Sequence, residues 1–462
     1  MLDRDVVRDQ PDQVRWAMEV KGIDTADLDG LLEMDERWRE LKAKGDDLRH
    51  ERNEISERIG KLKRAGDDEA AQQAIEQSQQ LKDELESVEE EAADLDERIS
   101  QEELLLPNIP SDDAPIGEDE DDNVELHRWG FDDLRDIPDE IIPHYDLAEE
   151  LELIDFARGA KVAGGGFQFL KGDGARLEYA LMRFMTDLHR EEHGYMDIFP
   201  PIPVNSAAMR GTGQFPTFDV RDSFRLGGSN TEPYDDDDLW LLPTAEVPVT
   251  NMYGGEILLD DDLPVKHVAF SPNFRREAGE HGTKTRGYVR VHQFNKVELV
   301  NFVRPEDSEE RHEELLTEAE EVLKRLGLPY RVIEICTGDM GAPHHRQYDI
   351  EVWAPADDMP DGPDIGGRWL EVSSASNFTE YQARRAGLRY RPERHESAEY
   401  LHTLNASGIA LARTVVAIME YYQNDDGTIT IPEVLRPYMN GQEIIEGHDP
   451  IGESAVGAGR RD

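Results

Sequence analysis

Between residues 273 and 298 the chain carries its densest group of side chains that could do chemistry. Arg275 and Glu277 come near the end of one expected strand, and a glycine-rich loop follows them. Residues 288–303 then alternate apolar and polar side chains, which predicts a second strand. Together the two strands predict a hairpin with one face toward water.

Three residues of the polar face suit one extended ligand. Arg290, Phe294 and Glu298 share this face and follow one another at intervals of about 13 Å along an extended strand. A cation, an aromatic ring and a carboxylate in this order could meet a polyphosphate, a purine and a polar amine or hydroxyl. The alternative is a half-exposed strand whose side chains only face water. The pattern alone leaves both interpretations open.

Two later segments add a carboxylate and a further arginine. Residues 369–377 form a short strand-like run in which Glu371 has hydroxyl side chains beside it, and such hard oxygen ligands suit Mg²⁺. Residues 403–413 lead into an apolar helix that contains Arg413. A buried arginine needs an anionic partner, because an unpaired buried charge is very costly. The alternative for Arg413 is a salt bridge to a core carboxylate.

The usual phosphate-binding loops are missing from the sequence. There is no G-x-x-x-x-G-K-[ST] sequence, and Gly164-Gly165-Gly166 lacks the G-x-G-x-x-G spacing after a strand. Any site for phosphates must therefore be built from side chains.

The elements that precede these residues begin with two long helices. Residues 25–106 carry apolar or small side chains at alternating steps of three and four, with lapses at Gly45 and Arg52. A polar cluster at 65–68 interrupts the pattern and Pro107 ends it. The steps fall at Leu31, Met34, Trp38, Leu41, Gly45, Leu48, Arg52, Ile55, Ile59 and Leu62, and then at Ala71, Ala74, Ser78, Leu81, Leu85, Val88, Ala92, Leu95 and Ile99. Two such helices fold back on each other as a hairpin that we expect to stand in solvent, since its flanks are charged. Periodicity alone favours a spacer or a dimerisation arm.

The rest of the chain predicts one large α+β domain, because Gly, Pro, Trp and alternating strands become common. We expect an N-terminal domain at 1–110, an acidic linker at 111–125, a globular domain at 126–446 and a disordered tail at 447–462. Residues 227–238 form a polar, acidic insertion that we expect to be a mobile loop.

The composition is strongly acidic. Against 102 Asp and Glu stand only 50 Lys and Arg, which gives a net charge of −52. The acid is spread along the whole chain, and only 12 of the basic residues are lysine, which favours adaptation to a salty cytoplasm over a surface for basic partners. Net charge therefore does not exclude a nucleic acid as partner.

Several classes of protein are excluded. With 38% hydrophobic residues the chain can build a core, so wholesale disorder is ruled out. No apolar run approaches the ~20 residues that span a bilayer, and the first residues have no signal-peptide pattern. Cys336 is the only cysteine, which excludes a disulfide framework and a zinc site made of several thiolates. We expect a cytoplasmic protein that makes no membrane contact.

The motifs resemble those of a known family when taken in order. They are His193–Pro201, Leu242–Glu246, Phe274–Glu277, Val291–Glu298, Glu371–Ser374 and Thr403–Gly408. In this order they are similar to the motifs of class II aminoacyl-tRNA synthetases, and specifically of seryl-tRNA synthetases, and the helical hairpin resembles the family's tRNA-binding arm. The resemblance covers roughly residues 1–440 and implies an antiparallel sheet flanked by helices. One departure is Ala412, where the general class II motif has Glu before its arginine.

The resemblance implies ATP-dependent activation of L-serine to seryl-adenylate and transfer of serine to tRNA(Ser), and to tRNA(Sec) where it is present. Arg275, Arg290 and Arg413 would be the catalytic residues that hold the phosphates. The residues implied for ATP are Arg275, Arg276, Glu277, Val291, Phe294, Glu371, Val372, Ser373 and Ser374, and those implied for serine are Thr244, Ala245, Glu246, Glu298, Asn405 and Ser407. Mg²⁺ would bind with ATP on Glu371 and Ser374, and no zinc is expected.

The resemblance also implies partners. A proline of the His193–Pro201 motif lies at the dimer interface in that family, so a homodimer is expected. tRNA would bind the helical arm through basic side chains that contact phosphates. These side chains are Arg37, Arg39, Lys42, Arg49, Arg52, Arg58, Lys61, Lys63 and Arg64.

Two other functions compete with the enzyme. A non-catalytic paralogue that binds a regulatory partner should lack one of the ATP-binding arginines, whereas all three are present. A coiled-coil scaffold with an appended globular domain leaves the clustered Arg, Glu and Phe of the second half unexplained.

Overall fold

The computed structural model describes residues 1–24, 26–216, 220–227, 234–277, 287–356, 366–392 and 397–448. The chain divides into two compact units, Leu2–Pro107 on one side and Asn108–Asp462 with Met1 on the other. The glycine-rich loop expected after Glu277, half of the 227–238 insertion and nearly all of the tail expected from 447 lie outside the described residues.

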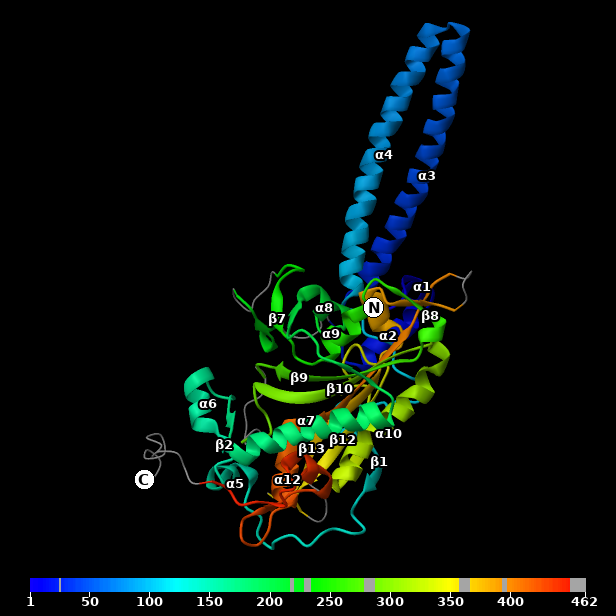
Figure 1. Ribbon diagram of the computed structural model, residues 1–462. Coiled ribbons are helices and arrows are strands. Elements are labelled where there is room, and N and C mark those ends of the chain that lie inside the picture. The colour runs from blue at the N-terminus through cyan, green and yellow to red at the C-terminus, as the bar shows by residue number, and fades with distance from the viewer. Residues whose placement is uncertain are drawn as a thin grey trace. The chain divides into compact units, whose positions relative to one another are not determined.

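The smaller unit contains two long antiparallel helices, as the heptad pattern predicts (Figure 1). Short helices α1 (Arg4–Asp9) and α2 (Pro11–Val20) precede α3 (Leu28–Ala65) and α4 (Asp68–Glu103). Gly66 ends α3 in the left-handed conformation with φ 77°, and Asp67 then caps α4 by accepting a hydrogen bond from the backbone N–H of Ala70. The polar cluster at 65–68 is therefore the turn of the helical arm.

The predicted apolar seam is buried between these helices. Its fully buried members are Leu31, Leu41, Gly45, Leu48 and Ile55 of α3 and Ala71, Ala74, Leu85, Val88, Ala92, Leu95 and Ile99 of α4. At 1.5 Å per residue each helix is about 55 Å long. The seam consumes the apolar residues of both helices, so the outer faces are left polar.

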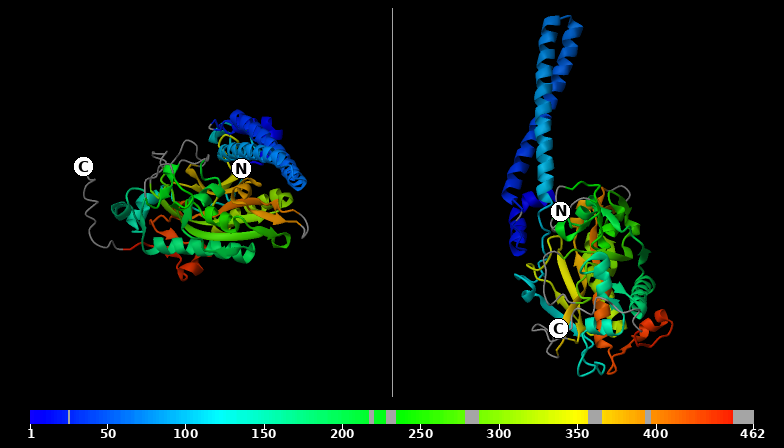
Figure 2. Two further views of the ribbon diagram at one scale, coloured as in Figure 1. Left: turned by 90° about the horizontal axis from the view of Figure 1, so that it is seen from above. Right: turned by 90° about the vertical axis from the view of Figure 1, so that its left-hand side faces the viewer.

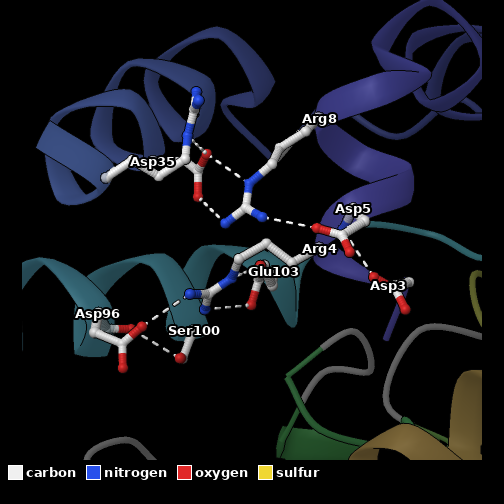
Figure 3. Close-up of polar contacts among 9 residues, drawn as sticks. Asp3, Arg4, Asp5, Arg8, Asp35, Asp96, Ser100 and Glu103 are labelled. Atoms are coloured by element: carbon white, nitrogen blue, oxygen red, sulfur yellow. Dashed lines mark hydrogen bonds and ion pairs between the residues drawn. The ribbon is translucent and has the colours of Figure 1, made fainter. Parts of the chain in front are cut away.

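Buried ion pairs fix α1 against the base of both long helices (Figure 3). Arg8 donates from Nε and Nη2 to the two carboxylate oxygens of Asp35, at 2.7 Å each. Arg4 bonds in the same way to Glu103, at 2.7 and 3.1 Å, and also reaches Asp96. Burial alone would raise the pKa of Asp35, but the hydrogen bonds from Arg8 and Arg39 hold it below its usual value.

The larger unit is built on an eight-stranded sheet whose strands are antiparallel except for one pair (Figure 1). In spatial order the strands are β1 (Val124–Trp129), β11 (Tyr330–Glu334), β12 (Arg346–Ala354), β13 (Arg368–Asn377), β16 (His402–Ala410), β10 (Gln293–Val303), β9 (Val265–Phe274) and β4 (Met196–Ile198). Only the edge strand β4 runs parallel to its neighbour β9. This confirms the predicted α+β fold with an antiparallel sheet.

Three helices pack against one face of this sheet. They are α7 (Gly172–Glu192), α10 (Ser308–Leu326) and α12 (Leu411–Tyr421), and Figure 2 shows α7 running along that face. Val297, Leu299 and Val303 of β10 join the hydrophobic core with these helices. Because side chains alternate along a strand, Glu298, Val300 and Phe302 face the other way.

A second layer covers the opposite face. There Val300 and Phe302 pack in a separate hydrophobic cluster with Ala245 and Val249, next to α9 (Glu246–Thr250). The remaining helices and strands are α5 (His144–Glu150), β2 (Ile154–Asp155), α6 (Phe156–Ala163), β3 (Phe169–Leu170), β5 (Pro203–Asn205), α8 (Ser206–Gly211), β6 (Phe224–Arg225), β7 (Leu239–Leu241), β8 (Ile257–Leu259), α11 (Tyr381–Ala386), β14 (Arg389–Arg391), β15 (Glu399–Tyr400), β17 (Ile429–Thr430) and β18 (Ile444–Ile445).

Two local expectations differ from the structure. The strand expected over 288–303 begins only at Gln293, and the expected water-facing side of the hairpin is wrong, since Lys296 and Glu298 are buried under the second layer. The acidic segment 111–125 is bonded into the larger unit: Ser111 donates to the His345 carbonyl at 2.8 Å, and Asn123 accepts from the Cys336 N–H at 2.9 Å. Among the described residues, no helix has the length and apolarity needed to cross a membrane.

Candidate active site

A cluster of buried polar side chains lies where β10 meets β16, in the interior of the sheet. The register places Glu298 opposite Ser407, and Glu298 is fully buried. Asn405 donates from Nδ2 to Glu298 Oε1 at 2.7 Å, and Lys296 Nζ lies 2.6 Å from Glu298 Oε2. The carboxylate is thus held from two sides, which is what a buried charge requires.

A second carboxylate, Glu246 at the start of α9, lies close to this cluster. It is buried, and Gln382 of α11 donates to its Oε1 at 2.6 Å, while Thr403 fixes the Gln382 amide at 2.7 Å. Burial, and after it the charge of Glu298, raises the pKa of Glu246 to about 7. The two carboxylates lie close enough for their charges to interact, and Lys296 already offsets part of this charge. A small ammonium compound has the charge that would suit this pair.

The other residues predicted for serine lie around these two. The Thr244 hydroxyl accepts a weak hydrogen bond from the Glu246 N–H at 3.4 Å. Ala245 is buried in the hydrophobic cluster of the second layer, so it offers packing rather than a polar contact. The Ser407 carbonyl accepts from the Ser373 hydroxyl at 2.5 Å, which ties β16 to β13.

The three arginines predicted for phosphates are each held by a near neighbour. Arg275 donates from Nε to the Pro243 carbonyl at 3.3 Å, and its guanidinium carbon lies 5.4 Å from the Phe294 ring centre. Arg290 donates from Nε to Glu277 at 2.6 Å. The structure therefore places Arg275 beside Phe294, and Arg290 beside Glu277, at the end of the β9–β10 hairpin.

Arg413 bonds to the predicted metal ligand. Its Nη1 donates to the Glu371 carbonyl at 2.6 Å and to the Glu371 carboxylate at 3.2 Å, and its Nε donates to the Val289 carbonyl at 3.3 Å. Glu371 is about half exposed, with 48% of its side-chain surface accessible. The partner of Arg413 is therefore not the core carboxylate considered as its alternative. Through Val289, Arg413 reaches the chain next to Arg290.

Carboxylates and a hydroxyl gather between β12 and β13 near Glu371. The register sets Asp349 opposite Ser374 and Glu351 opposite Glu371. Gln347 donates to both Asp349 Oδ1 and Ser374 Oγ, at 3.2 and 3.1 Å. Burial, and after it the charge of Glu371, raises the pKa of Asp349 well above its usual value.

This donor set suits Mg²⁺ in its chemistry. Carboxylate and hydroxyl oxygens are the ligands that Mg²⁺ takes, and it usually uses one or two carboxylates together with substrate phosphates. A divalent cation would also offset the repulsion between Asp349 and Glu371. No group of three or more His, Cys, Asp or Glu side chains among the described residues is arranged to hold a metal by itself.

Three predicted ATP residues have other primary contacts. Val291 and Val372 are buried in the main hydrophobic core, so only their backbone can contact a ligand. The Arg276 guanidinium lies 4.7 Å from the Phe224 ring centre, and the backbone N–H of Arg276 donates to the Asp222 carbonyl.

Sequence reasoning missed Lys296, Gln382 and Asp349 as parts of this site. Lys296 shares a strand face with Phe294 and Glu298, which is a signal that periodicity offers. Gln382 and Asp349 come from distant segments and are brought in only by tertiary contacts.

The fold and the site define the class of the protein. The tRNA synthetase class II core domain (G, H, P, S and T) matches residues 230–422, and the seryl-tRNA synthetase N-terminal domain matches residues 1–110. The chain is 68% identical to a serine–tRNA ligase of Haloquadratum walsbyi over the full length of both, and 47% identical to one of Carboxydothermus hydrogenoformans over 96% of this chain and 100% of the relative. A crystal structure of seryl-tRNA synthetase from Pyrococcus horikoshii, complexed with ATP, is similar at a TM-score of 0.86 with 36% identity, over 97% of this chain and 100% of that one.

The chain belongs to the seryl-tRNA synthetase family of class II aminoacyl-tRNA synthetases. This confirms the resemblance and the interpretation as an enzyme, and it does not favour the non-catalytic paralogue. Relatives at 65–68% identity come from halophilic archaea, which agrees with the interpretation of the acidic composition.

Proposed function

We propose that this chain activates L-serine with ATP and transfers the seryl group to tRNA(Ser), and to tRNA(Sec) where that tRNA is present. The observation that carries the proposal is the buried pair Glu246 and Glu298, next to a hairpin that presents Arg275 and Arg290. The serine carboxylate is ionised at neutral pH, so its attack on the α-phosphorus needs no general base. It needs alignment and neutralisation of charge.

Serine would bind at the buried cluster around Glu298, with its ammonium group on Glu246 and Thr244. The serine hydroxyl would bond to Glu298 and Ser407, and Asn405 would hold the Glu298 carboxylate in place. A site built to hydrogen-bond a hydroxyl rejects alanine strongly, because the missing group leaves buried polar atoms unpaired. Lys296 would keep the Glu298 carboxylate oriented, since the two are in contact.

ATP would replace the present partners of the three arginines. Arg275 would hold the α-phosphate, and Arg290 and Arg413 the β- and γ-phosphates, so that Glu277 and Glu371 release them. Adenine would stack on Phe294 with Arg276, Glu277, Val291, Val372 and Ser373 around it. Since Arg275 now lies over that ring, it has to turn toward the phosphates when adenine binds.

Glu371 and Ser374 would hold Mg²⁺ together with the phosphates of ATP, and no zinc site is proposed. When bound, the ion supplies charge neutralisation on the phosphate oxygens and the departing pyrophosphate. Asp349 and Gln347 would fix the Ser374 hydroxyl from behind.

We assign tRNA binding to the helical arm, with helix α3 as its contact face. All the basic residues proposed for phosphate contacts belong to α3, whereas α4 has only Lys82 and Arg98 among many acidic residues. Helix α3 has equal numbers of basic and acidic residues, whereas α4 is strongly acidic, so α3 offers RNA phosphates the more favourable face of the two.

The homodimer would form along the sheet edge at β4, where Met196 and Phe199 expose 62% and 81% of their surface. The described residues contain no membrane-crossing helix, and we propose that the enzyme works in the cytoplasm, where its tRNA substrates are.

Exchange of labelled pyrophosphate into ATP tests the proposal. In molar KCl we expect exchange that depends on serine and is at least a hundredfold slower with alanine. Arg413→Ala should lower kcat/KM for ATP by about 10²-fold, whereas Arg183→Ala, which removes an exposed ion pair on α7, should leave it unchanged. A folded protein without serine-dependent exchange, or full activity in Arg413→Ala, would contradict it.

A further inference from the structure

The segment 164–168, which joins α6 to β3, lies against the end of the β9–β10 hairpin. It contains the three glycines that match no known phosphate loop. We propose that this segment is a positioning element for ATP: it sets the place of His292 and, through His292, that of Arg275. The inference rests on the proposed role of Arg275 toward the α-phosphate.

The hydrogen-bond ladder of the hairpin changes at His292. The last regular pair joins Gln293 to Phe274, and Arg275 N–H then donates to the His292 carbonyl at 3.0 Å. In an antiparallel pair of this kind, the His292 N–H would donate back to Arg275. Instead it donates to the Gly166 carbonyl at 2.8 Å. This diversion explains why β10 starts at Gln293 rather than at 288.

The His292 ring, instead of the His292 backbone N–H, contacts the Arg275 carbonyl. His292 Nδ1 lies 2.9 Å from the Arg275 carbonyl, and because a carbonyl only accepts, Nδ1 carries the proton. Arg275 is therefore held through both its N–H and its carbonyl by a residue whose own backbone is held by Gly166.

Two further contacts from the segment act at the same point. Gln168 donates from Nε2 to the Gln293 carbonyl at 3.1 Å. The Phe167 ring centre lies 5.6 Å from that of His292 and 6.2 Å from that of Phe224. The contacts thus converge on residues 292 and 293, at the end of the hairpin that carries Arg275 and away from Glu298.

Gly166 is required by this close approach. A Cβ at residue 166 would lie 2.3 Å from the His292 ring, and the φ of +80° is unfavourable for other residues. Gly164 provides a matched comparison. Its φ of +101° is also positive, but no atom of the described residues lies within 4 Å of a Cβ built there. Alanine at 164 therefore imposes backbone strain without the clash.

Pyrophosphate exchange with full-length variants tests the proposal, with KM for ATP and KM for serine measured separately. We expect Gly166→Ala to raise KM for ATP at least tenfold and KM for serine less than threefold. Gly164→Ala should change both by less than threefold. His292→Ala removes the clashing ring, so the double variant Gly166→Ala/His292→Ala should have a KM for ATP within twofold of His292→Ala alone.

Each other result overturns the inference. Equal effects of Gly166→Ala and Gly164→Ala would mean that only backbone strain matters, and an equal rise of both KM values would mean a general structural role. If Gly166→Ala does not fold, Gln168→Ala replaces it: KM for ATP should rise threefold or more with KM for serine unchanged, and an unchanged KM for ATP would refute the positioning. Failure of the proposed function can be told apart from failure of this inference, because in that case the unaltered protein itself would show no serine-dependent exchange.

Discussion

Replacing Glu298 by Gln separates recognition of serine from stability of the fold. The change keeps the shape but removes the charge that faces Lys296 Nζ at 2.6 Å and accepts from Asn405 at 2.7 Å. Breaking a buried ion pair by removing one partner costs about 3–5 kcal/mol, so we expect the melting temperature to fall by several degrees.

The effect on activity follows from the bond that serine would lose. A hydrogen bond to a charged group contributes about 1.5–3 kcal/mol, which corresponds to a decrease of about 10- to 150-fold in kcat/KM for serine. Activation of alanine, which has no hydroxyl, should change little. The discrimination between the two amino acids in pyrophosphate exchange should therefore fall by the same factor.

A double variant provides the control. Lys296→Met/Glu298→Gln removes both charges, and replacing a whole buried pair is often neutral for stability. We expect the melting temperature to recover while the loss of serine discrimination remains. The reasoning is refuted if the single variant keeps its preference for serine, or if both amino acids lose activity equally.

Three further predictions follow. Serine should pair with ionised Glu246, whose pKa burial and Glu298 raise to about 7, so KM for serine should fall as the pH rises from 6 to 8; a flat profile would exclude this role. Arg8→Ala leaves the buried Asp35 carboxylate with Arg39 as its remaining arginine. We expect it to destabilise the smaller unit by about 2 kcal/mol, measured as faster amide hydrogen exchange in α3. Arg15→Ala, which removes an exposed pair, should not change that exchange, and equal effects would contradict the importance of burial. Lys61→Glu on α3 should weaken tRNA binding severalfold, whereas Lys82→Glu on α4 should have little effect; the reverse order would place the RNA on the other helix.

Local patterns predicted the parts of the fold that depend on neighbours in sequence. The heptad pattern predicted the two helices of the arm, because the buried positions of α3 and α4 recur at regular spacing along each helix. Alternation along residues 293–303 predicted which side chains of β10 enter the core, and Val297 and Leu299 do so. Glu298 could therefore be chosen from sequence as a residue of the opposite face.

What that face meets could not be predicted in this way. It was expected to face water, but α9 and its neighbours cover it, and they come from residues far along the chain. Gln382 is 136 positions from Glu246, and no local pattern joins them. The start of β10 at Gln293 likewise depends on a distant residue, because the His292 N–H donates to the Gly166 carbonyl instead of to the neighbouring strand.

The charge pattern of the site has a consequence for the free enzyme. Arg290 is paired with Glu277 and Arg413 with Glu371, so ATP at the proposed site would exchange these carboxylates for phosphates rather than fill an uncompensated positive site. Pairing of this kind would keep the arginines ordered before ATP binds. A cation bound to Glu371 would favour release of Arg413 from that carboxylate.

A crystal structure of this protein with ATP tests the central claim most directly. The account predicts that Arg275, Arg290 and Arg413 each come within hydrogen-bond distance of a phosphate oxygen, that Arg413 has left the Glu371 carboxylate, and that adenine lies on Phe294. A triphosphate bound elsewhere, with these arginines still on their present partners, would contradict it.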